Sequence, residues 1–186
     1  FADGVRHLAS IGHHRIGTVS HLMNNLNNSC RGFSEEEYME FLHYNGLEAT
    51  PELFHWTPYT QEAIRQAIRR MMLGPMPPTA IMCFSDFYAI HVYEALNELN
   101  IKIPEQVSVM GFCGYPGGQF LNPPLSTVDL MYENIGRSAA ELMLRSSEWF
   151  GTGEKPITIF TPHKIIPRES ISSLNEYEFR TAGTGV

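Results

Sequence analysis

Two uninterrupted apolar runs, separated by one helix-length segment, constrain the fold of this chain most strongly. The runs are Thr79–Phe84 (TAIMCF) and Val107–Phe112 (VSVMGF), and neither alternates polar with apolar residues. Strands that are apolar on both faces are typical of a parallel sheet covered by helices on both sides. The intervening segment Phe87–Leu99 predicts a helix that Ser85 and Asp86 can cap. The three segments together predict a strand–helix–strand crossover unit.

The rest of the chain continues this alternation. We expect one helix to end at 6–11, further helices at 35–44, 61–73 and 132–149, and strands at 15–19, 52–56, 126–130 and 157–166. Repeated units of this kind predict an α/β fold with a doubly wound parallel sheet. Ligands of such sheets bind beyond the carboxyl ends of the strands, so the residues at and after these ends are the first candidates for a site.

Composition sets the class of protein. The 186 residues are 43% hydrophobic and 18% charged, which fits one domain or two small lobes. No run of 18 apolar residues occurs, so we expect no membrane-spanning helix. The chain starts at Phe1 within an amphipathic segment that does not resemble a signal peptide, and we expect it to be part of a longer protein.

Charge argues against nucleic-acid binding by this portion of the protein. It carries 13 basic and 20 acidic residues, a net charge of −7, and no basic cluster that would neutralise phosphates. The three cysteines, Cys30, Cys83 and Cys113, are widely spaced without a zinc motif, and we expect them to be reduced thiols.

No catalytic or cofactor motif stands out, so we expect neither an enzyme nor a cofactor. The sequence contains no GxSxG or HExxH, and the glycine-rich GYPGG at 114–118 lacks the Lys-Ser/Thr of a phosphate loop. His13 and His14 are adjacent, which favours a polar turn over a metal site because neighbouring side chains point in different directions.

Two residues suggest ligand contacts from their type and position. Trp56 lies at the carboxyl end of a predicted strand, where its ring can stack on a sugar or flat ligand, or can simply cover a sheet edge. Arg31 lies in a Gly/Ser/Asn-rich loop and can bind hydroxyls or a carboxylate, or remain solvated.

Several ordered segments resemble the lactose/galactose-repressor (LacI/GalR) family of bacterial transcription regulators. HLASIGHHRIGTV resembles the family pattern HL-x-x-x-GH-x-RI, and the long segment from PPTAIMCFSD to VSVMGF resembles its PTA…ND…VSVVGFD pattern. PPLSTV, IGRSAAELML and IPRES follow in the family's order. The resemblance extends from Gly4 to about Ser173.

The resemblance implies a sensor of the periplasmic-binding-protein-like type I fold. Two lobes of that fold close on a small effector, and an N-terminal helix-turn-helix binds operator DNA as a homodimer. The chain begins about where the second lobe begins, so we expect the DNA-binding head and most of the first lobe to be absent. Residues 1–127 would form the second lobe, 128–160 would return to the first, 161–173 would add a strand to the second, and 174–186 would be a flexible tail.

The family also implies particular residues for the site and the dimer. The expected ligand contacts are Arg31, Trp56, Ser85, Asp86, Cys113 and Tyr132, and the expected dimer contacts are Ala89, Ile90, Tyr93, Phe120 and Leu121. A buried helix face would show the same apolar pattern as this interface. Within the helix that starts at Tyr132, we expect Ile135, Ala139, Leu142 and Met143 to face inward, although the absent first lobe would be its natural partner.

The departures from the family pattern bear on the effector. Ser85 stands where the family has Asn, and Cys113 stands where it has an Asp that holds a sugar hydroxyl. Arg31 matches the family's Arg only with a three-residue shift. The site therefore keeps aromatic walls and loses polar anchors, which argues against a common monosaccharide as the effector.

We therefore interpret the chain as the effector-sensing and dimerisation part of a cytoplasmic repressor that binds a sugar-like or other metabolite. The alternative is a periplasmic-type solute-binding protein, which would have no operator. An enzyme on a Rossmann-like sheet is the third hypothesis, and the missing catalytic set disfavours it.

Overall fold

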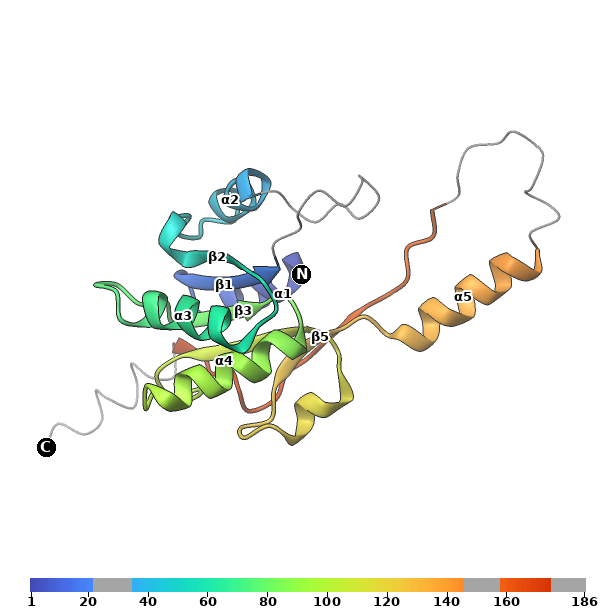
Figure 1. Ribbon diagram of the computed structural model, residues 1–186. Helices are drawn as coiled ribbons and strands as arrows, with labels where there is room; N and C mark the ends of the chain where they lie inside the picture. The colour runs from blue at the N-terminus through green and yellow to red at the C-terminus, as the bar shows by residue number, and fades with distance from the viewer. Residues whose placement is uncertain (22–34, 146–157, 175–186) are drawn as a thin grey trace, which may run out of the picture.

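The computed structural model describes residues 1–21, 35–145 and 158–174 (Figure 1). Their elements follow in the order α1 (Ala2–Ser10), β1 (Ile16–His21), α2 (Glu35–Tyr44), η1 (Pro51–Leu53), β2 (Phe54–Thr57), α3 (Gln61–Met72), β3 (Ala80–Cys83), α4 (Asp86–Glu98), β4 (Ser108–Cys113), η2 (Pro116–Phe120), β5 (Ser126–Asp129), α5 (Tyr132–Leu144) and β6 (Lys164–Ile166). The alternation expected from the sequence is confirmed. None of these helices is both long and apolar enough to cross a bilayer.

One sheet joins the strands in the order β2-β1-β3-β4-β5-β6. The first five strands are mutually parallel, whereas β6 pairs antiparallel with β5. The prediction of a doubly wound α/β sheet is confirmed, with the correction that its last strand runs the other way. The reason is that the chain returns to the sheet after α5 and passes alongside β5 (Figure 1).

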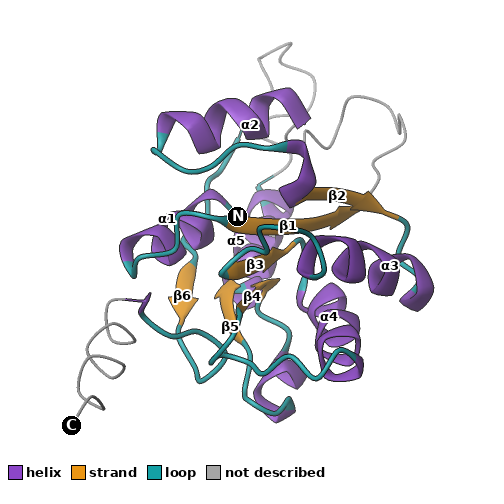
Figure 2. Ribbon diagram, turned by 90° about the vertical axis from the view of Figure 1, so that its left-hand side faces the viewer, coloured by secondary structure: helices purple, strands orange, loops and turns teal. Residues whose placement is uncertain are grey.

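Helices cover both faces of the sheet, as the two-sided apolar strands predict. Along β3, Ile81 and Cys83 pack with residues of α3 and α4, whereas Ala80 and Met82 pack with residues of α1 and α2. Figure 2 shows the two pairs of helices on opposite sides of the strands. All four of these β3 residues are fully buried.

Local capping explains where α3 and α4 begin. The hydroxyl of Thr60 accepts a hydrogen bond from Ala63 N at 3.3 Å, and the hydroxyl of Ser85 accepts one from Tyr88 N at 3.4 Å. Each cap satisfies a backbone donor that the first helical turn leaves free. The predicted cap at Ser85 is confirmed.

Helix α5 differs from the others because it contains no buried residue. Figure 1 shows it away from the sheet, at the end of the segment that follows β5. Met143 is 70% exposed and Leu144 is 85% exposed. The prediction that the apolar residues of this helix, Met143 among them, face inward is wrong for this chain, because no other described element packs against them.

Residues 168–174 return to the sheet through side-chain and backbone hydrogen bonds. Ser170, fully buried, donates its hydroxyl to Val109 O at 2.6 Å, and Val109 N donates to Ser170 O at 2.8 Å. Ser172 N donates to the Ser108 hydroxyl at 3.0 Å. The strand expected at 157–166 is shorter than predicted, since only Lys164–Ile166 pairs with β5, and residue 157 lies outside the described part of the chain.

Candidate functional site

The parallel strands bring five chain segments to one edge of the sheet. Strands β1 to β5 end at His21, Thr57, Cys83, Cys113 and Asp129, and their parallel pairing places these carboxyl ends along the same side. Helices α3 and α4 both begin at this edge, so their positive N-terminal dipole ends also lie there. It is the edge at which doubly wound sheets bind ligands.

Asp86, a predicted ligand contact, is bound inside the protein. Its side chain is 1% exposed, its Oδ1 accepts a hydrogen bond from the Thr127 hydroxyl at 2.6 Å, and its Oδ2 accepts one from Tyr115 N. Burial raises the pKa of Asp86, and these two hydrogen bonds act in the opposite direction. The carboxylate joins β5 and the segment after β4 to the start of α4. Its role as a ligand contact stays a prediction.

Gly111 makes room for this carboxylate. A Cβ atom at Gly111 would stand 2.0 Å from Asp86 Oδ1 and 3.0 Å from a methyl group of Leu125. Real atoms do not approach so closely, so the glycine before Phe112 is required by packing rather than by a turn. The buried position of Asp86 therefore depends on the absence of a side chain at residue 111.

Two other predicted contacts, Cys113 and Tyr132, lie together at the carboxyl end of β4. Burial raises the pKa of the Cys113 thiol, an effect that the neighbouring Tyr132 hydroxyl partly offsets. The interaction with Cys113, followed by burial, raises the pKa of Tyr132 to about 12. Both groups are therefore uncharged near neutral pH, and this part of the edge offers a thiol and a phenol instead of a carboxylate.

The backbone at Cys113 has an unusual conformation. Its φ angle is 98°, in the left-handed region that side-chain-bearing residues rarely adopt. The turn lets the chain double back so that Tyr115 N reaches Asp86. Cys113 itself is partly exposed, which leaves its side chain accessible beside Tyr132, 56% exposed.

Trp56 lies on the edge strand β2, away from this pair. Its ring packs edge-on against Phe54 at a centroid distance of 4.7 Å and is partly exposed. Strands β1 and β3 separate β2 from β4 in the sheet, which corresponds to about 14 Å between Trp56 and Cys113 at about 4.8 Å for each strand. A single small ring cannot contact both residues while the sheet edge lies open.

The remaining predicted ligand contacts are Ser85 and Arg31. Ser85 is partly exposed, and its hydroxyl caps α4. Arg31 lies outside the described residues. Sequence reasoning also missed three partly exposed residues at this edge: His21 at the end of β1, Phe84 after β3 and Phe112 on β4. The sequence alone did not indicate these residues as ligand contacts, because partly exposed aromatic residues at strand ends cannot be distinguished from core residues by residue type.

Aromatic rings gather on the α1/α2 side of the edge. The Phe1 ring lies 5.8 Å from Phe112, 6.5 Å from Phe84 and 5.9 Å from Tyr38, measured between ring centroids. Tyr38 is buried and its hydroxyl pairs with Thr18 at 2.7 Å. The α1/α2 side of the carboxyl edge is therefore lined by aromatic rings.

The predicted dimer contacts divide into buried and exposed residues. Ala89 is fully buried, and Tyr93 is 8% exposed with its hydroxyl donating to Pro123 O at 3.0 Å. Ile90 and Leu121 are partly buried, whereas Phe120 is 83% exposed. Ala89 and Tyr93 thus belong to the core between α4 and the sheet, and Phe120 is the most exposed member of the set; the role of these residues in a dimer stays a prediction.

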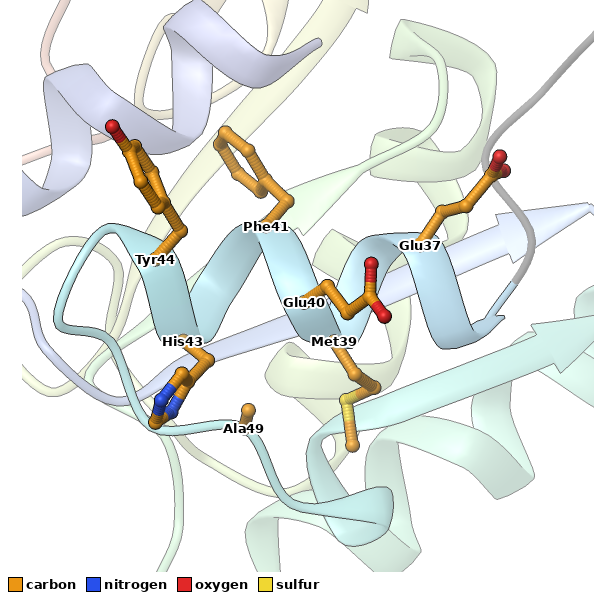
Figure 3. Close-up of a pocket in the computed structure, with 7 residues that line it drawn as sticks. All are labelled: Glu37, Met39, Glu40, Phe41, His43, Tyr44 and Ala49. Carbon is orange, nitrogen blue, oxygen red and sulfur yellow. The ribbon is translucent and has the colours of Figure 1, made fainter.

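A shallow depression elsewhere on the surface does not form a convergent site. Figure 3 shows its lining, which comprises Glu37, Met39, Glu40, Phe41, His43, Tyr44 and Ala49. Phe41 and Tyr44 leave α2 on one side and Met39 and His43 on the other, so their side chains do not point at a common space. Within the described ranges, no group of three or more His, Cys, Asp or Glu residues is arranged to hold a metal ion.

Comparison with known proteins places these features in a family. Residues 5–171 match the model of the periplasmic binding protein-like domain. The chain is similar to the HTH-type transcriptional repressor PurR of Actinobacillus pleuropneumoniae, with 28% identity over 92% of this chain and 50% of that protein. It is also similar to the HTH-type transcriptional repressor CytR of Escherichia coli, with 31% identity over 76% of this chain and 41% of that protein.

Solved structures agree on the fold. A LacI family transcriptional regulator from Bifidobacterium animalis matches with a TM-score of 0.76 and 25% identity, over 92% of this chain and 60% of that one. A putative LacI regulator from Bacillus cereus matches with a TM-score of 0.76 and 24% identity, over 92% of this chain and 59% of that one. The chain spans about half the length of the repressors that it matches.

Proposed function

Since the chain belongs to the periplasmic binding protein-like domain family and is homologous to LacI-family repressors, we propose that it is the effector-sensing part of a DNA-binding transcriptional regulator. A small molecule bound at the carboxyl edge of the sheet favours one arrangement of the sensor over another. This difference in binding free energy changes the affinity of the whole regulator for its operator. The chain itself performs no bond chemistry.

The observation that carries this proposal is the gathering of accessible, uncharged ligand-type groups at one edge. Trp56, Cys113 and Tyr132 are all partly or largely exposed there, each at or just after the carboxyl end of a strand. Effector contacts of this kind need aromatic surface and a few hydrogen-bonding groups rather than a nucleophile and base.

The exposed helix α5 supports the proposed division of the chain. In this division residues 1–127 form the second lobe, 128–160 return to a first lobe, 161–173 rejoin the second and 174–186 form a tail. Helix α5 has no buried residue, and Ile159 and Phe160 are 50% and 92% exposed, as expected of surfaces that a first lobe would cover. Operator contact would come from a helix-turn-helix preceding the sensor, in a cytoplasmic homodimer.

A thermal-shift screen against sugars, sugar phosphates and nucleobases tests the proposal in the complete regulator. We expect one compound to raise the melting temperature, to quench or enhance Trp56 fluorescence, and to change operator affinity. A Trp149→Phe background leaves Trp56 as the tryptophan of this chain. Trp56→Ala should abolish the stabilisation, while the matched Trp56→Phe variant, which keeps an aromatic face, should retain part of it.

Two results count against the proposal. Compounds that stabilise the protein without altering operator binding favour the alternative function, a solute-binding protein of the periplasmic type. Stabilisation that is unchanged in Trp56→Ala and also in Tyr132→Ala places the ligand away from this edge.

A further inference from the structure

We propose that Asp129 is a positioning residue of the effector site, which holds Tyr132 beside Cys113 at the carboxyl edge of the sheet. The inference rests on the proposed function and adds to the same site a residue that is not expected to touch the effector. Its basis is the set of contacts that the Asp129 carboxylate makes where β5 ends.

One carboxylate oxygen fixes the turn that leads from β5 into α5. Asp129, the last residue of β5, accepts a hydrogen bond at its Oδ1 from Met131 N at 2.8 Å. An Asp side chain that binds the backbone two residues further on stabilises a turn. Met131 has φ of 52° and ψ of 55°, the left-handed conformation that is unfavourable for residues other than glycine. The hydrogen bond to Asp129 therefore offsets part of the cost of this conformation.

This turn decides where Tyr132 lies. Tyr132 is the first residue of α5 and directly follows Met131. Its interaction with Cys113 is the main cause that raises its pKa to about 12. Helix α5 contains no buried residue, so burial of the helix does not hold its first residue in place. The direction in which the chain leaves Asp129 is what brings the phenol to the thiol.

The chain after β4 confines the same carboxylate from the other side. Cys113 and Asp129 are partners in the parallel register of β4 and β5. A Cβ atom at Gly114 would stand 2.6 Å from Asp129 Oδ1 and 2.7 Å from Asp129 Cα. A side chain at position 114 would displace Asp129, so the glycine leaves room for the carboxylate between the ends of the two strands.

The second carboxylate oxygen contacts the returning chain. Lys164 Nζ lies 3.5 Å from Asp129 Oδ2, and the two residues are partners in the antiparallel register of β5 and β6. The Lys164 side chain is 55% exposed, and ion pairs this open to solvent contribute little to stability. Figure 1 shows the return segment beside the segment that leaves β5. We assign the positioning role to the Oδ1 contact, and the Oδ2 contact supplies a control.

Three variants of the complete regulator separate these contacts. Asp129→Ala removes both, whereas Asp129→Asn keeps an oxygen that can accept from Met131 N and loses only the charge. Lys164→Met removes the ion pair alone. The ionisation of the Tyr132 phenol is followed by NMR of the ¹³C-labelled tyrosine ring between about pH 8 and pH 11, and Tyr132→Phe identifies its signal.

In the unchanged protein, in Asp129→Asn and in Lys164→Met, we expect Tyr132 to stay largely un-ionised at pH 11, because its pKa is about 12. In Asp129→Ala the phenol leaves Cys113 and its pKa falls toward the ordinary value of about 10, which raises the ionised fraction at pH 11 about tenfold. An equal fall in Asp129→Asn would assign the effect to the charge, and no fall in Asp129→Ala would remove it altogether. Either result overturns the proposal.

A buried tyrosine shows whether the fold survives the high pH. Burial raises the pKa of Tyr38, so its signal should stay un-ionised in every variant that remains folded. A merely structural effect of Asp129→Ala would shift Tyr38 together with Tyr132, whereas the positioning role shifts Tyr132 alone. A joint shift of the two tyrosines counts against the proposal.

Hydrogen exchange at neutral pH tests the turn without exposing the protein to alkali. The Met131 amide should exchange at least about fivefold faster in Asp129→Ala than in the unchanged protein, the size of one neutral hydrogen bond. Asp129→Asn and Lys164→Met should leave its exchange rate nearly unchanged. An unaltered rate in Asp129→Ala overturns the proposal.

Neither measurement needs an effector, so this inference and the proposed function can fail separately. If both measurements give the expected results and no compound in the thermal-shift screen binds, the positioning of Tyr132 stands and the sensor function falls. If a compound binds at the edge while Tyr132 and Met131 do not respond to Asp129→Ala, the sensor function stands and the positioning role falls.

Discussion

The hydroxyl of Thr127 donates a hydrogen bond of 2.6 Å to Oδ1 of Asp86 and thereby joins β5 to the first turn of α4. Tyr115 N donates to the other carboxylate oxygen. Three segments that diverge from the carboxyl edge are thus tied to one buried carboxylate. The edge on which we place the effector site depends on this group for its shape, although the group itself is turned away from solvent.

Replacing Thr127 with valine should destabilise the protein by about 1.5–3 kcal/mol, because a buried carboxylate oxygen loses its donor while the side-chain shape is kept. Urea denaturation at pH 7 measures the change. Thr127→Ser keeps the hydroxyl and is the matched control, for which we expect a clearly smaller loss. Equal losses in the two variants would mean that the methyl group, not the hydrogen bond, supplies the stability.

Replacing Gly111 with alanine should destabilise the fold by about 1–3 kcal/mol or more, because the added Cβ stands 2.0 Å from Asp86 Oδ1 and one of the two groups must move. Gly136→Ala is the control. Gly136 lies within α5 with nothing within 4 Å of an added Cβ, so alanine there should be neutral or stabilise by up to about 1 kcal/mol. Thermal unfolding distinguishes the two, and a tolerated Gly111→Ala would contradict the packing described for Asp86.

Acid should destabilise the protein partly through His13. This residue is 1% exposed, its Nε2 donates to Ser172 O at 2.9 Å, and burial is the main cause that lowers its pKa. With a lowered pKa in the folded state, the unfolded chain takes up the proton first. Stability is therefore complete above the unfolded pKa of about 6.5 and falls as the pH decreases below it.

Unfolding free energies measured between about pH 7.5 and pH 5 check this dependence. His13→Gln should reduce the slope and lower stability at neutral pH, whereas His14→Gln, at the exposed neighbour, should change the slope much less, because the charge of His14 is the smallest of the causes that shift the pKa of His13. A slope that is unaltered in His13→Gln would assign the acid sensitivity to other groups, such as His55, whose pKa burial also lowers.

Much of the fold could be predicted from the sequence, because the pattern of apolar residues along the chain predicts which segments form strands and which form helices. The two-sided apolar strands at Thr79–Phe84 and Val107–Phe112 and the punctuated helix between them have the predicted class and nearly the predicted bounds. The direction of β6 could not be predicted in this way, because an apolar run does not record which way its chain passes a neighbour. Helix α5 is exposed because none of the other described elements covers its apolar residues. The periodicity of a helix predicts an apolar face but not whether anything packs against that face.

The site was less predictable than the fold. Asp86 has the residue type of a ligand contact, but its burial depends on Thr127 and Tyr115, which are distant in sequence. His21 is the converse case: nothing nearby in the sequence marks it, and only the packing of α4 against the sheet brings the Tyr88 hydroxyl to its Nδ1 atom. Residue type indicates what a side chain can bind, and the tertiary contacts decide what remains free to bind.

Common hexoses and pentoses should bind the protein weakly, with Kd above about 1 mM, which is about −4 kcal/mol. The family resemblance implies an Asp at position 113, and the thiol of Cys113 cannot accept the charge-assisted hydrogen bonds that a carboxylate receives from sugar hydroxyls. The neighbouring Asp86 cannot substitute for it, because its side chain is 1% exposed and both its oxygens are occupied. Calorimetry with D-ribose and D-glucose on the complete regulator measures these affinities.

The variant Cys113→Asp tests the cause of this weak binding. The backbone φ of 98° at this position suits Asp better than most residues, so the variant should fold, and it places a carboxylate beside Tyr132 at the open end of β4. We expect its affinity for at least one of the two sugars to rise about tenfold or more, the value of one hydrogen bond to a charged group. Cys113→Ser, which adds a neutral hydroxyl at the same place, should gain little. A micromolar Kd for either sugar in the unchanged protein would instead mean that other groups, Arg31 among them, anchor a sugar without any carboxylate at position 113.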